Sequence, residues 1–139
     1  MVNSKQSTVN SDDRIVAFID GHDRVTIPMV RIFCRQNGMS TDGPFAMAIR
    51  PKVLVWSGMS RTFIETIQRL LDEKRIFMWP SSPWENERQG GVQKCVAINY
   101  LPESAPDWRW FPICFRTEEM VAKSGAAGLG LDLEAEIVG

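Results

Sequence analysis

The stretch SGMSRTFIETIQRLLDEKRIF, residues 57–77, carries the clearest periodic pattern in this sequence. Its apolar residues recur at spacings of three and four, which places them on one face of a helix. These residues are Phe63, Ile64, Ile67, Leu70 and Leu71. Ser60 precedes the pattern and is a suitable N-cap, because its hydroxyl can accept a hydrogen bond from a free backbone N–H of the first turn. The stretch therefore predicts an amphipathic helix over residues 60–74, followed by a strand over residues 76–79.

The residues before this stretch predict two more helices. Residues 27–37 follow Thr26, carry Pro28 in the first turn and are closed by Gly38, all of which are typical of helix ends. Residues 51–57 start with Pro51 and have an apolar face that ends at Gly58, so a short helix is predicted here too. Residues 45–49 predict a small strand, and residues 14–19 are compatible with either a short helix or a strand.

The residues after the stretch predict a hairpin and a C-terminal extension. Residues 80–91, PSSPWENERQGG, have the composition of a loop, and residues 92–101 alternate like a strand, so residues 76–101 predict a β-hairpin. In the extension, residues 102–139, a short helix is expected from Thr117. Strict alternation over residues 129–137 predicts an edge strand that pairs with this sheet or with a second subunit.

Length and composition are those of an ordinary globular domain. The chain has 139 residues, of which 44% are hydrophobic and 24% charged, and its formal net charge is −1. Residues 1–12 are polar and are expected to be disordered and to lack a signal peptide. No apolar run is long enough to span a membrane, so a cytoplasmic protein is expected. Three scattered cysteines and one histidine favour free thiols and no metal or other cofactor.

The predicted order is helix, small strand, helix, tight turn at Gly58, helix, strand, loop and strand. In this order, residues 49–101 resemble the winged helix-turn-helix family, whose first motif helix ends in Gly, an apolar residue and Ser, here Gly58, Met59 and Ser60. The resemblance implies an α+β fold with three core helices and a β-hairpin wing at PSSPWENERQGG. The winged-helix domain is then expected to cover residues 13–101, and residues 102–139 to pack on it or to form a dimer interface.

The resemblance implies a DNA-binding surface. The outward face of the helix from Ser60 would enter the major groove, where arginine and threonine can reach base edges. Lysine and arginine on the wing would contact phosphate, which sets the register of the protein on the duplex. The expected DNA-binding residues are Ser60, Arg61, Thr62, Glu65, Thr66 and Arg69 on the helix, with Arg88 and Lys94 on the wing.

Two departures from the family pattern leave a second function open. Phe63 stands where a small polar residue usually faces DNA, and residues 60–94 are nearly neutral, whereas affinity for DNA rests largely on neutralising phosphates. The first hypothesis is a homodimeric DNA-binding regulator of transcription or replication, of the kind common on phages and plasmids. The second is a protein-interaction module that acts as a small inhibitor or adaptor. The residues expected at a protein interface are Phe63, Trp79, Trp84, Trp108 and Trp110.

Catalysis is not expected from this sequence. Phosphate-binding loops, nucleophile elbows and zinc-protease motifs are all missing. His22 is the single histidine and falls in a predicted turn, so a serine or cysteine mechanism would have only this one base to use. Binding to double-stranded DNA or to another protein is therefore the predicted activity.

Overall fold

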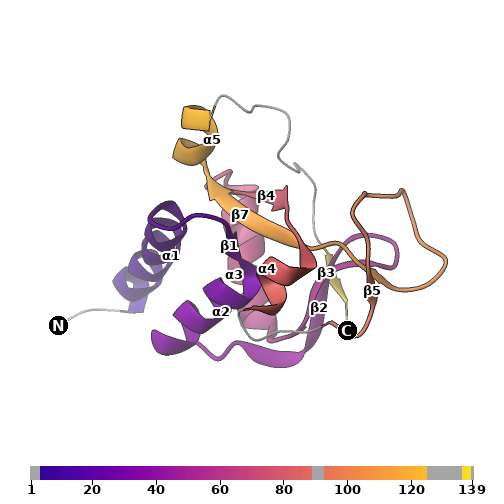
Figure 1. The fold of residues 1–139 in the computed structure, drawn as a ribbon. Helices are drawn as coiled ribbons and strands as arrows, with labels where there is room; N and C mark the ends of the chain where they lie inside the picture. Colours follow the sequence, from indigo (N-terminus) through magenta and orange to yellow (C-terminus); the bar gives the residue numbers. More distant parts are fainter. Residues whose placement is uncertain (1–3, 89–92, 125–135, 139) are drawn as a thin grey trace.

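A computed structural model describes residues 4–88, 93–124 and 136–138 of the chain (Figure 1). In the described part, helices and two β-sheets form a mixed α+β fold, so the predicted fold class is confirmed at this level. The helices are α1 (Ser4–Asp20), α2 (Ile27–Gln36), α3 (Arg61–Asp72), α4 (Pro83–Glu87) and α5 (Glu118–Ser124). The strands are β1 (Val25–Thr26), β2 (Asp42–Arg50), β3 (Val53–Met59), β4 (Ile76–Pro80), β5 (Val96–Ala97), β6 (Arg109–Trp110), β7 (Ile113–Thr117) and β8 (Glu136–Val138).

The smaller sheet joins strands that are far apart in the sequence. Its order is β1-β7-β4, and both pairings are antiparallel. Phe115 of β7 lies between Val25 and Met78, and all three side chains are buried in the core. Because side chains alternate along a strand, Cys114 lies on the other face of this sheet. Its register partners there are Thr26 and Trp79.

The larger sheet has the order β5-β6-β3-β2-β8. Strands β2 and β3 form an antiparallel hairpin, which Lys52 closes with a left-handed backbone φ of 61°. Strand β8 pairs antiparallel with the outer side of β2, whereas β6 and β5 add in parallel on the side of β3. In Figure 1, β2, β3 and β5 lie at the opposite side of the molecule from α1.

One hydrophobic core connects both sheets with the three longer helices. Helix α3 contributes Phe63, Ile64, Ile67 and Leu70, whose side chains are at most 1% exposed. Helices α1 and α2 and strands β1 to β4, β6 and β7 supply the rest of this core. The apolar stripe that predicted the helix is therefore the surface on which the other elements pack.

The start of α3 confirms the predicted N-cap. Ser60 Oγ accepts a hydrogen bond from the backbone N of Phe63 at 3.0 Å and donates one to the carbonyl oxygen of Ser40 at 2.7 Å. Gly43 of β2 passes so close that a Cβ atom there would lie 2.8 Å from Met59 O and from Ser60 Cα. This hydrogen-bonded junction ties the start of α3 to β2 and to the chain before it.

The predicted helix over residues 51–57 is wrong, because these residues form the hairpin turn and most of β3. Val53, Leu54, Val55 and Trp56 are all buried, and β3 is hydrogen-bonded to β2 on one side and to β6 on the other. A short apolar run with β-branched residues fits a strand enclosed on both faces as well as it fits a buried helix. Consequently α3 is preceded by strand β3, and not by the helix and tight turn of a helix-turn-helix motif.

The predicted β-hairpin over residues 76–101 is also wrong. Strand β4 forms as predicted, but it pairs with β7, which lies more than 30 residues downstream. Of the predicted strand 92–101, the described residues 93–101 contain one short strand, Val96–Ala97, which joins the other sheet. Alternation sets which side chains share a face, but it does not specify the partner strand.

The other predicted elements compare as follows. The helix over residues 27–37, the strand over residues 45–49 and the short helix near Thr117 are confirmed by α2, β2 and α5. Residues 14–19 belong to a helix, and α1 begins at Ser4, inside the segment that was expected to be disordered. Most of the alternating stretch 129–137 lies outside the described residues. Its end belongs to β8, which pairs with the chain's own β2.

The core position of Phe63 leads to a stability prediction. We expect Phe63→Ala to lower the free energy of unfolding by about 3–5 kcal/mol, because the lost aromatic side chain leaves a cavity in a closely packed region. Urea unfolding followed by circular dichroism measures this change. Trp84→Ala is the matched control, since Trp84 is exposed and its loss should cost far less. Equal costs for the two variants would contradict this placement of Phe63.

Candidate functional site

The outward face of α3 is narrower than the sequence predicts. Arg61, Thr62 and Glu65 are exposed, as expected. Thr66 is buried, however, and its hydroxyl donates a hydrogen bond to the carbonyl oxygen of Thr62 at 2.9 Å, so the prediction that Thr66 faces outward is wrong. The guanidinium of Arg61 lies over the ring of Phe45 from β2, 5.4 Å from its centroid. Of the residues expected to contact DNA from α3, Arg61, Thr62 and Glu65 are thus exposed as predicted, whereas Thr66 is not.

Arg69 is held by an ion pair with α1. Its Nε and Nη2 donate to the two carboxylate oxygens of Asp12 at 2.9 Å and 2.7 Å, a bidentate geometry. These hydrogen bonds are the main cause that raises the pKa of Arg69, so its positive charge is strongly favoured. The charge is already compensated inside the protein, and Arg69 has less to offer an external phosphate than an unpaired arginine.

The five residues expected at a protein interface separate into buried and exposed groups. The prediction of an interface role is wrong for Phe63 and Trp110, because both side chains are buried in the core. Trp110 packs edge-on against Trp56 and donates its indole N–H to the carbonyl oxygen of Val55. Trp79 is half-buried, whereas Trp84 and Trp108 are exposed.

Three exposed apolar side chains lie on or near the segments that form β5 and β6. Val96 of β5, Tyr100 and Trp108 are 65%, 64% and 42% exposed, and we call these three residues the β5 surface. Val96 of β5 pairs in register with Arg109 of β6, and Trp108 is the residue before Arg109. In the described part of the chain, β5 has a sheet partner on one side only.

The two residues predicted to contact phosphate from a wing are both exposed. Arg88 follows α4, and its guanidinium lies 4.8 Å from the centroid of the Trp84 ring. Lys94 precedes β5. Neither residue lies on a β-hairpin formed with β4, since β4 pairs with β7.

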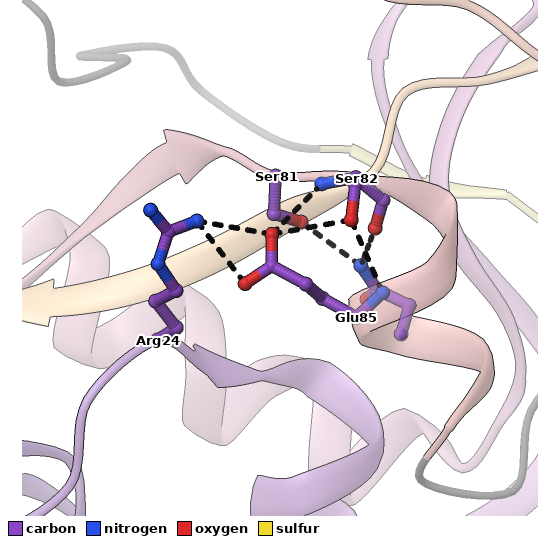
Figure 2. Close-up of polar contacts among 5 residues, drawn as sticks. Arg24, Ser81, Ser82 and Glu85 are labelled. Atoms are coloured by element: carbon purple, nitrogen blue, oxygen red, sulfur yellow. Dashed lines mark hydrogen bonds and ion pairs between the residues drawn. The ribbon is translucent and has the colours of Figure 1, made fainter.

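A polar cluster at the start of α4 joins two segments that are far apart in the sequence (Figure 2). Arg24 precedes β1 with a left-handed backbone φ of 52°, and its Nη1 lies 3.1 Å and 3.2 Å from the two carboxylate oxygens of Glu85. Glu85 also accepts a hydrogen bond from the backbone N of Ser82, while Ser82 Oγ accepts one from the backbone N of Glu85. This reciprocal pair is a capping box, which supports the N-terminus of α4.

The environment of Glu85 favours its charged form. Burial by itself would raise the pKa of this carboxyl group, since the side chain is only 14% exposed. The hydrogen bond from the backbone of Ser82 and the interactions with Arg24 outweigh burial, and the pKa of Glu85 is lowered. A carboxylate is therefore maintained at the junction of α4 with the segment before β1.

A surface hollow of about 360 Å³ lies beside this cluster, on the outer face of the smaller sheet. Its walls come from the turn before β1, the end of β4 and the middle of β7. The lining residues are Asp23, Arg24, Trp79, Pro80, Cys114 and Arg116. Arg116 lies over the ring of Trp79, 4.9 Å from its centroid, and burial raises the pKa of the Cys114 thiol to about 11.

The sequence contained a partial signal for this region. Within the predicted loop, Ser82 and Glu85 have the three-residue spacing of a capping box. No apolar run follows them, so the signal for a helix was incomplete. Arg24 is 61 residues from Glu85, and Arg116 and Trp79 meet only because β7 pairs with β4. No local pattern predicts such contacts, because they depend on how distant strands pair.

The structure also bears on metal binding, disulfide bonds and membrane-spanning helices. Among the described residues, no group of three or more histidine, cysteine, aspartate or glutamate side chains is placed to hold a metal ion. The three cysteines are free. Within the same residues, no helix has the length and apolar character needed to cross a membrane.

Comparison of the chain with family models, curated proteins and solved structures gave no match.

The lowered pKa of Glu85 leads to a prediction about pH. The contribution of its carboxylate to stability should be complete above the unfolded pKa of 4.5 and should disappear as the pH falls through the folded value. We expect Glu85→Gln to be less stable than the wild type at pH 7 by about 1 kcal/mol or less, since Arg24 is largely solvent-exposed.

Urea unfolding of both proteins between pH 7 and pH 3 measures this effect. The difference in the free energy of unfolding should shrink below pH 4.5. Glu119→Gln is the control, because Glu119 forms an exposed pair with Lys123 at i,i+4 spacing. A difference that stays constant down to pH 3 would show that the charge of Glu85 does not stabilise the fold.

Proposed function

We propose that this chain is a winged-helix-type domain. Some of its elements come from other segments than those that the sequence predicts. The order α1, β1, α2, α3, β4 and β7 supports the proposal, because it repeats the succession of helix, small strand, helix, helix, strand and strand. The antiparallel sheet β1-β7-β4 packs with the three helices in one core. In this arrangement the β2–β3 hairpin is inserted between the second and third helices, and residues 81–112 connect the two last strands.

We further propose that the domain acts by binding another protein. The exposed apolar side chains of the β5 surface carry this proposal, since exposed aromatic residues are enriched at interaction sites. Strand β5 also presents a sheet edge, at which an extended segment of a partner can add a further strand through its backbone. The proposed partner is therefore a protein with an extended apolar segment that pairs with β5 and covers Tyr100 and Trp108.

The surface around α3 supports DNA binding less well. Arg69 is paired with Asp12, and Glu65 and Asp72 are exposed on the same helix. Each exposed carboxylate would lie near the phosphates of a bound duplex, which weakens the electrostatic attraction on which such binding depends. This balance of charges is the reason for placing the protein-interaction role first.

A quantitative binding assay tests the protein-interaction role. A stoichiometric partner is isolated with the full chain, purified and titrated against variants of the chain by calorimetry. We expect Trp108→Ala and Tyr100→Ala each to weaken binding by about tenfold or more, the range for central aromatic residues of an interface. Arg61→Ala on α3 should bind like the wild type.

The oligomeric state is measured in the same experiment by light scattering. A dimer that Trp108→Ala dissociates would identify the partner as a second copy of the chain. If Trp108→Ala and Tyr100→Ala bind the partner as tightly as the wild type, the β5 surface is not the interface and the proposal fails.

The second candidate function is DNA binding through the first turn of α3. One observation favours it: Arg61 and Thr62 are exposed at the N-terminal end of the helix, where the helix dipole attracts anions. Arg88 and Lys94 are exposed cations that could contact phosphate. In this role Ser60 would act through its N-cap, and Glu65 would face the groove beside Arg61.

Fluorescence anisotropy with a labelled duplex at about 50 mM salt tests this candidate, because low salt favours even non-specific contacts. If DNA binding is a function, Arg61→Ala should weaken it by about tenfold, whereas Trp108→Ala should not change it. A wild-type protein that leaves the anisotropy unchanged under these conditions has no DNA-binding role.

A further inference from the structure

The outer face of the smaller sheet combines features that the proposed protein interface does not use. The register places Cys114 between Thr26 and Trp79, and Arg116 two residues further along β7 on the same face. Arg24 approaches from the turn before β1 and lines the same hollow. Two guanidinium groups and an indole ring, contributed by three segments, therefore surround one concave space.

The two arginines differ in how far their charges are compensated. Arg24 uses Nη1 for Glu85, which leaves its other nitrogens without a hydrogen bond in the described part of the chain. Arg116 has no ion pair with any described residue, and its Cζ lies 4.9 Å from the centroid of the Trp79 ring. No hydrogen bond from the Arg116 guanidinium to a described residue is present, so its N–H groups are available to an acceptor.

Trp79, Pro80 and Cys114 add apolar surface to a lining that is otherwise polar. Trp79 is half-buried, Pro80 presents its ring, and the Cys114 thiol remains neutral at physiological pH because burial raises its pKa to about 11. Beside Cys114 in register, Thr26 Oγ1 is buried and has no hydrogen-bond partner among the described residues. The volume of about 360 Å³ falls within the range of small-molecule sites, about 300–1,000 Å³.

We propose that this hollow binds a small organic anion, whose carboxylate or phosphate group is held by Arg116 and Arg24 and whose apolar body lies against Trp79 and Cys114. An arginine offers paired N–H donors that match the two oxygens of a carboxylate or phosphate. Asp23 also lines the hollow and repels a second acidic group, so the proposed ligand carries a single one. The size of the hollow restricts the body to about one ring system.

Binding of an anion in this hollow would also affect the contacts of α4. Arg24 is the residue that links the hollow to Glu85 and hence to the capping box of α4. An anion that draws the Arg24 guanidinium toward Arg116 weakens the pair with Glu85.

Two-dimensional NMR of the indole N–H groups in the full chain tests the proposal, with Trp79→Phe identifying the Trp79 signal. The probes are benzoate, phenyl phosphate and the neutral benzyl alcohol. We expect saturable shifts of the Trp79 signal with at least one of the two anions and none with benzyl alcohol. The anion that binds more tightly identifies the acidic group as a carboxylate or a phosphate.

Variants of the two arginines locate the site. Arg116→Gln should weaken anion binding by about tenfold or more, as expected for loss of a charge-assisted hydrogen-bonding group, and Arg24→Gln should weaken it as well. Arg61→Gln is the matched control, because Arg61 is also an exposed arginine over an aromatic ring. Circular dichroism confirms that each variant is folded.

Three results would overturn the proposal: no saturable shift with either anion, equal shifts with benzyl alcohol, or unchanged binding in Arg116→Gln. An equal loss of binding in Arg61→Gln would also overturn it, since it would indicate non-specific attraction of anions to the protein. These outcomes are independent of the protein interface, because none of the variants alters the β5 surface.

Discussion

Burial of one face of α3 is the constraint on which the rest of the molecule depends. The four side chains that are fully enclosed on this helix touch a core to which both sheets and both N-terminal helices contribute. A helix of 12 residues has little stability in isolation, and most of its stability in a protein comes from packing of its apolar face. The converse also holds, because without α3 the two sheets would lose the surface that they share.

Polar pairs between distant segments fix how the peripheral elements attach to this core. Asp12 of α1 binds Arg69 of α3, Asp20 at the end of α1 accepts a hydrogen bond from Thr117 of β7, and Glu85 of α4 binds Arg24. Each pair joins residues at least 57 positions apart. Such pairs add little net stability at the surface, but their bidentate or buried geometry restricts the orientation of the helices.

The aromatic side chains of this chain fall into a buried group and an exposed group. Phe63, Trp56 and Trp110 are enclosed in the core, whereas Tyr100 and Trp108 remain exposed on residues that follow β4 and precede β7. Core aromatics are explained by folding alone. The exposed ones do not belong to the core of the described part of the chain, and this contrast directs the proposed interface to β5 and not to α3.

Local patterns in the sequence determined the elements with a regular period and a clear boundary. The stripe from Phe63 to Leu70, the N-cap Ser60, helix α2 between Pro28 and Gly38, and strand β4 follow from spacing and capping chemistry, which act between near neighbours. Tertiary structure decided what the run from Val53 to Trp56 becomes, since an enclosed apolar segment satisfies its backbone equally well as helix or strand until its neighbours are present. It also decided that β4 pairs with β7 and that Arg24, Trp79 and Arg116 surround one hollow, because strand pairing over long distances depends on the whole core and not on any local pattern.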